Sequence, residues 1–247
     1  MAGESTLTVV LVYPEVLGTY GDRGNAIALA HRARGRGLPL RVLAVERGQA
    51  LPTRADIYLI GGGEDAATVL AWRRLRDEPA LPAAVAGGAV CFGVCAGYQL
   101  LARSFTGPDG QPRQGLGLLD VTCARQARRA VGEVLAESGD PRIGFLTGFE
   151  NHQGDARLGA AARPLGRLVT GVGNGDGRFE GAVQGHVVGT YLHGPALVRN
   201  DGLADRLLEL VAGPLAPYDD EPVRRLRQER RAAALASRRP RWRRRGR

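Results

Sequence analysis

Apolar runs alternate with amphipathic stretches through the first hundred residues of the chain. Four short runs rich in β-branched and aliphatic residues are typical of buried strands: Thr6–Tyr13, Leu40–Val45, Asp56–Ile60 and Ala89–Phe92. Stretches with helical spacing follow them at Ala26–Arg36, Ala66–Arg76, Pro79–Ala86 and Tyr98–Ser104. Strands that alternate with helices predict βαβ units, and hence a mostly parallel sheet with helices on both faces.

The pattern changes after residue 104. Short strand-like runs now follow one another between Gly, Asp and Asn turns, at Gly115–Thr122, Ala130–Ala136, Ile143–Phe149, Leu165–Val172, Phe179–Gln184 and His186–Tyr191. These runs predict antiparallel hairpins added to one edge of the sheet, which makes the expected fold class α/β with a mixed second half. Leu203–Val211 is predicted to be a final amphipathic helix.

The charge of the chain is concentrated at one end. The 247 residues carry a formal net charge of +9, yet residues 223–247 hold twelve arginines and a single acid, Glu229, which leaves residues 1–222 at about −2. The basic character therefore belongs to a tail, and the body gives no sign of a nucleic-acid-binding surface. We expect one domain over residues 1–213, then a Pro-containing linker and an Arg-rich, disordered tail over residues 214–247.

The cysteines and the apolar runs indicate a cellular compartment. Cys91, Cys95 and Cys123 are odd in number and lack the spacing of a disulfide framework, which favours reduced thiols. No run of 18 apolar residues is present, and the N-terminus lacks the pattern of a secretory signal. We expect a cytoplasmic protein without a membrane span. No cluster of His, Cys and Asp has metal-ligand spacing, so no metal site is expected.

The strongest local motif surrounds Cys95. The segment Gly93–Gly97 joins a predicted buried strand to a predicted helix in the G-x-C-x-G form of a nucleophile elbow. Small residues are needed on either side because the nucleophile sits on a sharp, strained turn. The turn would place the Cys95 sulfur at a helix N-terminus, which favours a thiolate. Cys91 and Cys123 lack this context and are expected to be inert packing residues.

A thiolate nucleophile needs a base and donors for an oxyanion. His193 ends the strand-like run before Gly194 and Pro195, at the carboxyl edge where catalytic partners collect in α/β sheets. His152 is the competing candidate for the base.

A glycine run supplies candidate oxyanion donors. Gly61, Gly62 and Gly63 follow a predicted strand directly, and bare N–H groups there can approach a substrate oxygen closely. The N–H groups of Gly62 or Gly63, together with that of Ala96, would form the oxyanion hole.

Together these motifs resemble the class I glutamine amidotransferases, within them the cobyric-acid-synthase-like branch. The segments Tyr20–Asn25, Gly148–His152 and Gly189–Pro195 are similar, more narrowly, to the glutaminase subunits of lipid II isoglutaminyl synthases. The resemblance covers about residues 7–212 and implies a class I glutaminase-like, flavodoxin-like fold. By position it makes Cys95 the nucleophile and His193 its base.

The resemblance also implies a substrate and a partner. Glutamine would be hydrolysed through a Cys thioester, and its ammonia passed to a Mur-ligase-like synthetase subunit of a heterodimer. That partner would hold ATP and Mg, with no cofactor on this chain, and would amidate D-glutamate of lipid II to D-isoglutamine in peptidoglycan synthesis. A glutamine carboxylate needs a cation, for which Arg125, Arg128 and Arg129 are candidates; only the motif match selects Arg129. No nucleic acid is expected to bind.

The chain departs from the family pattern at one position. Many class I amidotransferases carry Glu two residues after the catalytic His, where this chain has Pro195. Glu150 or another acid is left as the alternative orienting group.

Two other functions remain open at this point. One is an amidotransferase of corrinoid (cobyric acid) synthesis, although such enzymes usually carry an ATP-binding domain and this chain, which lacks Lys, has no G-x-x-x-x-G-K-[ST] loop. The other is a non-enzymatic protein that binds RNA or anionic lipid through the tail around Trp242.

Overall fold

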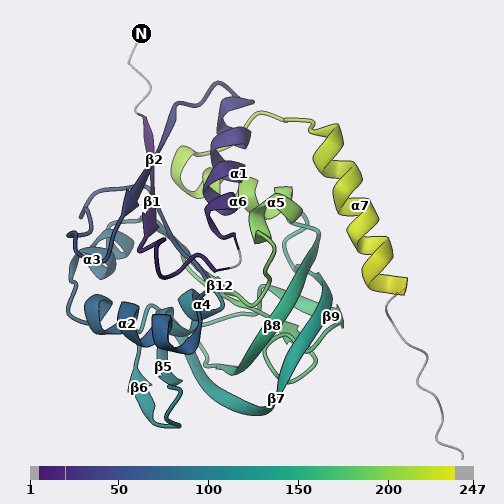
Figure 1. Ribbon diagram of the computed structural model, residues 1–247. Helices are drawn as coiled ribbons and strands as arrows, with labels where there is room; N and C mark the ends of the chain where they lie inside the picture. The colour runs from purple at the N-terminus through teal and green to yellow at the C-terminus, as the bar shows by residue number, and fades with distance from the viewer. Residues whose placement is uncertain (1–5, 20, 237–247) are drawn as a thin grey trace, which may run out of the picture.

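The computed structural model describes residues 6–19 and 21–236, and its centre is a six-stranded sheet (Figure 1). The spatial order of its strands is β11 (Ala182–Gln184), β12 (Val187–Thr190), β4 (Val90–Val94), β3 (Ile57–Ile60), β1 (Leu7–Val12) and β2 (Leu40–Val45). All neighbouring strands are parallel except the β11–β12 pair. The prediction of a mostly parallel sheet is confirmed.

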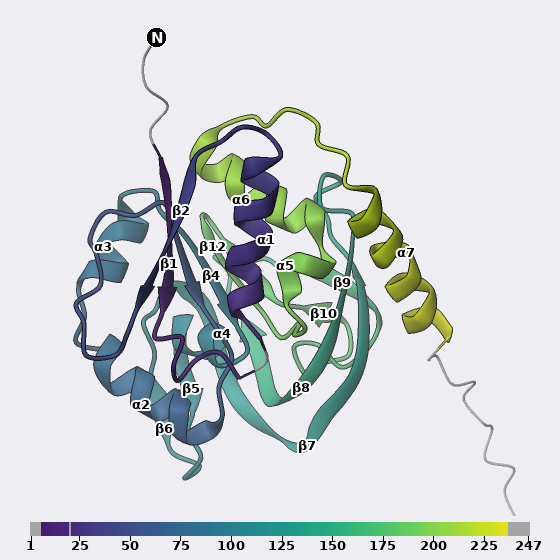
Figure 2. The same cartoon turned by 45° about the horizontal axis from the view of Figure 1, so that its top comes forward.

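Helices cover both faces of this sheet (Figure 2). One face carries α1 (Arg23–Arg34), α5 (Ala196–Arg199) and α6 (Asp201–Ala212), and the other carries α2 (Asp65–Leu75), α3 (Ala80–Ala86) and α4 (Ala96–Leu101). Every residue of β1, β3, β4 and β12 is buried, whereas the edge strand β2 is largely exposed. Burial on both faces explains why the central strands are continuous apolar runs instead of alternating ones.

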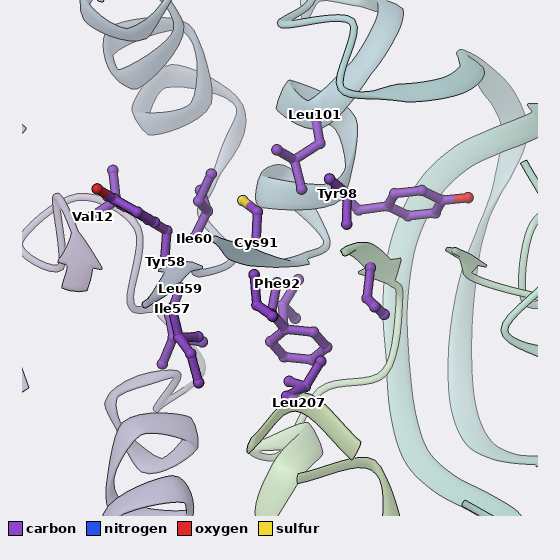
Figure 3. Close-up of a cluster of buried hydrophobic side chains, with 14 of the residues drawn as sticks. Val12, Ile57, Tyr58, Leu59, Ile60, Cys91, Phe92, Tyr98, Leu101 and Leu207 are labelled. Carbon is purple, nitrogen blue, oxygen red and sulfur yellow. The ribbon is translucent and has the colours of Figure 1, made fainter. Parts of the chain in front are cut away.

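The core lies on both sides of β4 (Figure 3). Phe92 points toward Leu207 of α6, and on the opposite face Tyr98 and Leu101 of α4 cover the strand. All four side chains are almost completely buried. This packing fixes the strand that carries the elbow between two helical layers.

The second half of the chain forms mostly a separate sheet. Its strands, in spatial order, are β10 (Phe179–Glu180), β9 (Gly166–Thr170), β7 (Leu119–Glu137), β5 (Ala102–Thr106) and β6 (Pro112–Gln114), and β8 (Phe145–Leu158) pairs with β7. Antiparallel pairs are present as predicted, but of these only the β11–β12 hairpin belongs to the first sheet. The long β7–β8 hairpin instead lies beside the first sheet and meets its β12 end.

The helix predicted over Tyr98–Ser104 is shorter in the structure. It ends at Leu101, and the chain turns directly into β5, where Ala102 adopts extended backbone angles. β5 pairs with β6 and with β7. These strand pairs override the helical pattern of the segment, which the spacing within the segment alone could not reveal.

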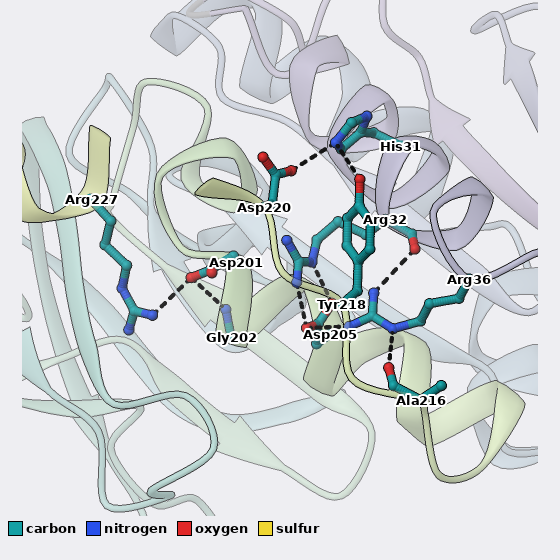
Figure 4. Close-up of polar contacts among 10 residues, drawn as sticks. All are labelled: His31, Arg32, Arg36, Asp201, Gly202, Asp205, Ala216, Tyr218, Asp220 and Arg227. Atoms are coloured by element: carbon teal, nitrogen blue, oxygen red, sulfur yellow. Dashed lines mark hydrogen bonds and ion pairs between the residues drawn. The ribbon is translucent and has the colours of Figure 1, made fainter. Parts of the chain in front are cut away.

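The segment predicted as a linker and disordered tail is ordered as far as residue 236, which corrects that prediction. Tyr218 lies under the guanidinium groups of Arg32 and Arg36, 5.4 and 5.2 Å from its ring centre, and Arg36 donates to the Ala216 carbonyl (Figure 4). The chain then forms α7 (Glu221–Ala236), which contacts α5, β7 and β8. Residues 237–247, with Trp242, lie outside the described residues.

Polar contacts hold α7 against the body. The Arg227 guanidinium donates to Asp201 at 2.8 Å and to the carbonyl oxygens of Ile143 and Phe145, and it lies 4.3 Å from the Phe145 ring centre. Sequence reasoning treated every arginine of this region as solvated. One of them instead satisfies buried backbone carbonyls, which is why the segment is fixed.

Candidate active site

Cys95 occupies a strained turn between β4 and α4. Its backbone angles are φ 52° and ψ −100°, in the left-handed half of φ that non-glycine residues rarely adopt, and its N–H donates to the Thr190 carbonyl at 2.8 Å. A Cβ on Gly97 would lie 2.1 Å from the Ile60 carbonyl oxygen, and one on Gly93 would lie 2.7 Å from the Gly97 carbonyl carbon. The small residues of the motif are therefore required by backbone packing, as the nucleophile-elbow interpretation predicts.

His193 follows the neighbouring strand at the same edge of the sheet. β12 pairs in parallel with β4, with Thr190 opposite Val94, so the two chain segments leave the sheet together. His193 then forms an antiparallel bridge with Phe149 of β8: its N–H donates to the Phe149 carbonyl at 2.8 Å, and the Phe149 N–H donates back at 3.2 Å. The second sheet thus fixes the backbone of the predicted base.

The predicted catalytic pair, Cys95 and His193, is buried, and burial is the main cause of the pKa shift of each side chain. It raises the pKa of the Cys95 thiol to about 12, a change that the hydrogen bond from Ala96 N–H opposes. Burial likewise lowers the pKa of His193 to about 4, and the nearby His152 adds to that shift. Burial of Cys95 therefore opposes the thiolate that its place at the start of α4 was expected to favour. Cys95 and His193 both lie next to Gly62, and at neutral pH these shifts leave the thiol protonated and the imidazole neutral.

The glycine run lies against the elbow. Gly97 donates its N–H to the Gly61 carbonyl at 3.1 Å, which joins the two loops. A Cβ placed on Gly62 would lie 3.0 Å from His193 Cε1 and 3.5 Å from Cys95 Cβ. The Ala96 N–H hydrogen-bonds to the Cys95 sulfur. Gly63 lies farther away, because a Cβ on it would meet Val16, Leu17 and Ala67. Of the three predicted oxyanion donors, the structure therefore places Gly62 and Ala96 beside the predicted nucleophile.

Arg129 lies on a bulge of β7 at the rim of this site. The β7–β8 register shifts between Arg125 and Ala130, and Arg129 donates to Asn151 Oδ1 of β8 at 3.0 Å. Its positive charge lowers the pKa of Cys95, against the larger effect of burial. Arg125 instead pairs with Asp65 at 3.0 Å and donates to Gln153. Of these two arginines, only Arg129 acts on the Cys95 site.

His152, the competing candidate for the base, is engaged elsewhere. It is buried, stacks on Tyr191 with ring centres 3.8 Å apart, and accepts the Gly154 N–H at its Nδ1. Its Nε2 lies 3.6 Å from Glu150 Oε2. These contacts indicate a packing role beside His193 instead of a role as base.

Glu150, the proposed orienting acid, is also occupied. Its carboxylate accepts backbone N–H groups of Val172 and Gly173 at 2.8–3.1 Å.

Two other buried acids near the site, Glu180 and Asp22, have no role that the sequence predicts. Glu180 accepts from the Thr190 hydroxyl and the Tyr191 N–H, and burial raises its pKa to about 7. Asp22 accepts the N–H of Gly62.

No local sequence pattern predicts the contacts of Asp22 or Glu180. Asp22 belongs to the Tyr20–Asn25 motif, of which Tyr20 lies outside the described residues, and its partner is forty positions away. Glu180 lies on a two-residue strand.

Cys91 and Cys123 are buried, and burial raises the pKa of the Cys123 thiol to about 12 and raises that of the Cys91 thiol as well. Both fit the predicted packing role.

Comparison with known proteins places this site in a family. The model of the CobB/CobQ-like glutamine amidotransferase domain matches residues 8–201. The chain belongs to this family. This glutamine amidotransferase is 35% identical over 206 residues to the lipid II isoglutaminyl synthase (glutamine-hydrolyzing) subunit GatD of Staphylococcus aureus (strain N315), a match that covers 82% of this chain and 83% of GatD. The resemblance and the enzymatic, glutamine-hydrolysing class expected from the sequence are thereby confirmed.

A second relative and a solved structure complete the comparison. Cobyric acid synthase of Methylobacterium nodulans is 38% identical over 161 residues, which cover 62% of this amidotransferase but only 32% of the synthase. A chain in the structure of PurLQS from Thermotoga maritima superposes with a TM-score of 0.57 at 16% identity, over 84% of this chain and 98% of that one, and shows the same fold. Within residues 6–19 and 21–236, no helix is long and apolar enough to cross a bilayer.

Proposed function

We propose that this amidotransferase is the glutamine-hydrolysing subunit of a two-subunit enzyme that amidates D-glutamate of lipid II to D-isoglutamine in peptidoglycan synthesis. The observation that carries the proposal is the coverage of the relatives. The match to GatD spans 83% of that protein, whereas the match to cobyric acid synthase spans only 32% of the synthase. The partner would be an ATP-dependent, Mur-ligase-like synthetase that receives ammonia from this chain in the cytoplasm.

The site geometry supports hydrolysis through a thioester. Neutral His193 accepts the Cys95 thiol proton as the sulfur attacks the side-chain carboxamide carbon of glutamine. The oxyanion that forms is held by N–H groups of Gly62 or Gly63 and Ala96, each such donor contributing about 3–4 kcal/mol in the transition state. Arg129 holds the substrate carboxylate.

The remaining steps return the enzyme to its starting state. His193 passes its proton to the departing nitrogen, the C–N bond breaks, and ammonia leaves a γ-glutamyl thioester on Cys95. Water then attacks the thioester carbonyl and gives its proton to His193. The C–S bond breaks and the sulfur takes that proton back, so that glutamine and water become glutamate and ammonia.

The direct test is reconstitution with the synthetase subunit found beside this chain in the native cell. The complex should amidate lipid II with glutamine as nitrogen donor in the presence of ATP, and should release one glutamate for each amide formed. Amidation of cobyrinic side chains instead, or glutamine turnover without any amide on lipid II, would contradict the assigned acceptor.

A further inference from the structure

Asp22 is a buried carboxylate inside the site that the mechanism above does not use. It precedes the first residue of α1 and is only 3% exposed. Its Oδ2 accepts the Gly62 N–H at 2.7 Å, and its Oδ1 accepts from Asn25 Nδ2 at 3.4 Å. Burial raises its pKa to about 6, and the two hydrogen bonds oppose that shift. A carboxylate is therefore held, at a cost, directly on a predicted oxyanion donor.

Asp22 lies beside the catalytic pair as well. A Cβ placed on Gly62 would find Asp22 Oδ2 at 3.4 Å, His193 Cε1 at 3.0 Å and Cys95 Cβ at 3.5 Å. The charge of Asp22 is among the causes that raise the pKa of the Cys95 thiol, after burial. A negative charge at this point opposes both the thiolate and the oxyanion that the reaction needs.

The segment around Asp22 also contacts the loop that carries the base. Asn25 Oδ1 accepts the Leu197 N–H at 2.9 Å, and a Cβ on Gly24 would lie 2.3 Å from the Pro195 ring. Residues 22–25 therefore touch both the glycine run and the chain just after His193. A shift of this segment would change the oxyanion donor and the base loop together.

One N–H group cannot fully serve two anions. While Asp22 accepts from Gly62, the substrate oxyanion cannot use that donor, and two negative oxygens at one donor would repel each other. We propose that Asp22 is a positioning residue that plugs the oxyanion hole of the free subunit. It holds the Gly62 N–H and keeps Cys95 protonated until it is displaced or neutralised. This inference rests on the proposed glutaminase function and adds a control point to it.

Two substitutions remove the charge with little disturbance. Asp22→Asn keeps the shape of the side chain, and Asp22→Ser keeps a short polar group; both residues are favoured at the start of a helix. The matched control is Asp56→Asn, because Asp56 Oδ2 also accepts a backbone N–H, that of Thr8 at 2.7 Å. Asp56 directly precedes β3, so it lies at the end of that strand opposite the site. Circular dichroism verifies that each variant is folded.

The first measurement is the rate of Cys95 alkylation by iodoacetamide between pH 7.5 and 9.5 in the full chain, followed by peptide mass spectrometry. Only the thiolate reacts. If loss of the Asp22 charge lowers the pKa of the Cys95 thiol by one unit, alkylation of Cys95 therefore becomes about tenfold faster. Arg129, Glu64, Cys123 and Tyr191 also interact electrostatically with this thiol, and His193 lies beside it at Gly62; the variants leave all five in place. Cys91 and Cys123 serve as internal references.

We expect about tenfold faster alkylation of Cys95 in both Asp22 variants, and the wild-type rate in Asp56→Asn. The second measurement is glutamine hydrolysis by the free subunit, whose kcat should rise in the Asp22 variants. Alkylation of Cys95 at or below the wild-type rate in a folded Asp22 variant would overturn the proposal that Asp22 plugs the oxyanion hole. Loss of glutamine hydrolysis in these variants would overturn it too, because Asp22 would then be a group that the reaction requires. The proposed function fails separately, if the wild-type chain with its partner releases no glutamate.

Discussion

His193 and Phe149 exchange both of their backbone hydrogen bonds, at 2.8 and 3.2 Å, although His193 follows β12 of the first sheet and Phe149 belongs to β8 of the second. Pro195 stands two residues after the histidine, and this β-bridge restrains the histidine backbone. The β7–β8 hairpin that supplies Phe149 also carries Arg129 on its bulge. One hairpin therefore positions both the predicted base and the predicted carboxylate-binding group.

Replacement of the nucleophile should separate glutamine use from ammonia use. In the reconstituted complex, Cys95→Ala should lower glutamine-dependent amidation by about 10³-fold or more, because no thioester can form. Amidation driven by added ammonium salt should persist, because the synthetase is untouched. Cys123→Ala, at another buried cysteine, is the control. Full glutamine-dependent activity in Cys95→Ala would refute the assignment.

Removal of the rim arginine should weaken glutamine binding. Arg129→Ala deletes the cation expected to hold the substrate carboxylate, and a lost charged hydrogen bond of about 1.5–3 kcal/mol corresponds to roughly a 10- to 100-fold increase in KM. We expect kcat to change much less, because the group lies away from the reacting carbon. Arg128→Ala, which alters the neighbouring exposed arginine of the same bulge, should keep the wild-type KM. An equal effect of the two variants would reassign the binding group.

Local features of the sequence predicted the first sheet and the elbow, because both depend on nearest neighbours. Buried parallel strands are continuous apolar runs, and the turn at Cys95 needs Gly97 in any environment. The second sheet could not be predicted, since β5 is a strand only because it pairs with β6 and β7, and the helical spacing of its own residues carries no sign of these partners.

The missed features of the site share a cause. The protonation of the thiol depends on how deeply Cys95 is buried, and the Asp22–Gly62 contact joins residues forty positions apart. Arg227 shows the same limit in the tail, where composition indicated solvation and only the folded chain presents the carbonyls that it binds. Composition and spacing carry no record of such contacts.

Neutralising the plug should change stability in a pH-dependent way. The pKa of Asp22 rises from 3.8 to about 6 on folding, so the native state binds the proton more tightly than the unfolded chain. The stability contributed by this group is complete below about pH 4 and is lost as the pH rises through 6. Asp22→Asn should therefore be more stable than the wild type at pH 8, by up to about 3 kcal/mol for a pKa shift of about 2 units. Its Tm should be higher by roughly 6–12 °C, and the difference should disappear near pH 4.

Thermal unfolding at pH 4, 6 and 8 checks this expectation, with Asp56→Asn as the control for loss of a carboxylate that accepts a backbone N–H. A constant difference across the three pH values would mean that the carboxylate acts through shape alone. Destabilisation at pH 8 would show that the hydrogen bond to Gly62 outweighs the cost of burying the charge.

Arg227 should account for much of the attachment of α7. Arg227→Ala removes the ion pair with Asp201 (Figure 4). It also leaves the carbonyls of Ile143 and Phe145 without this donor and removes the cation that lies over the Phe145 ring. We expect a loss of about 1–3 kcal/mol, or roughly 2–10 °C in Tm. Arg225→Ala is the matched control, because Arg225 is exposed and pairs with Glu229 on the same helix, an interaction of about 0.3–0.5 kcal/mol.

The same pair of variants distinguishes a structural helix from a binding tail. If α7 serves mainly to brace the β7–β8 hairpin, Arg227→Ala should also raise the KM for glutamine, since that hairpin carries Arg129, while Arg225→Ala leaves both Tm and KM unchanged. Equal, small effects of the two substitutions on Tm would show that α7 adds little to the body. Its exposed arginines would then be the feature of this helix that remains to be explained.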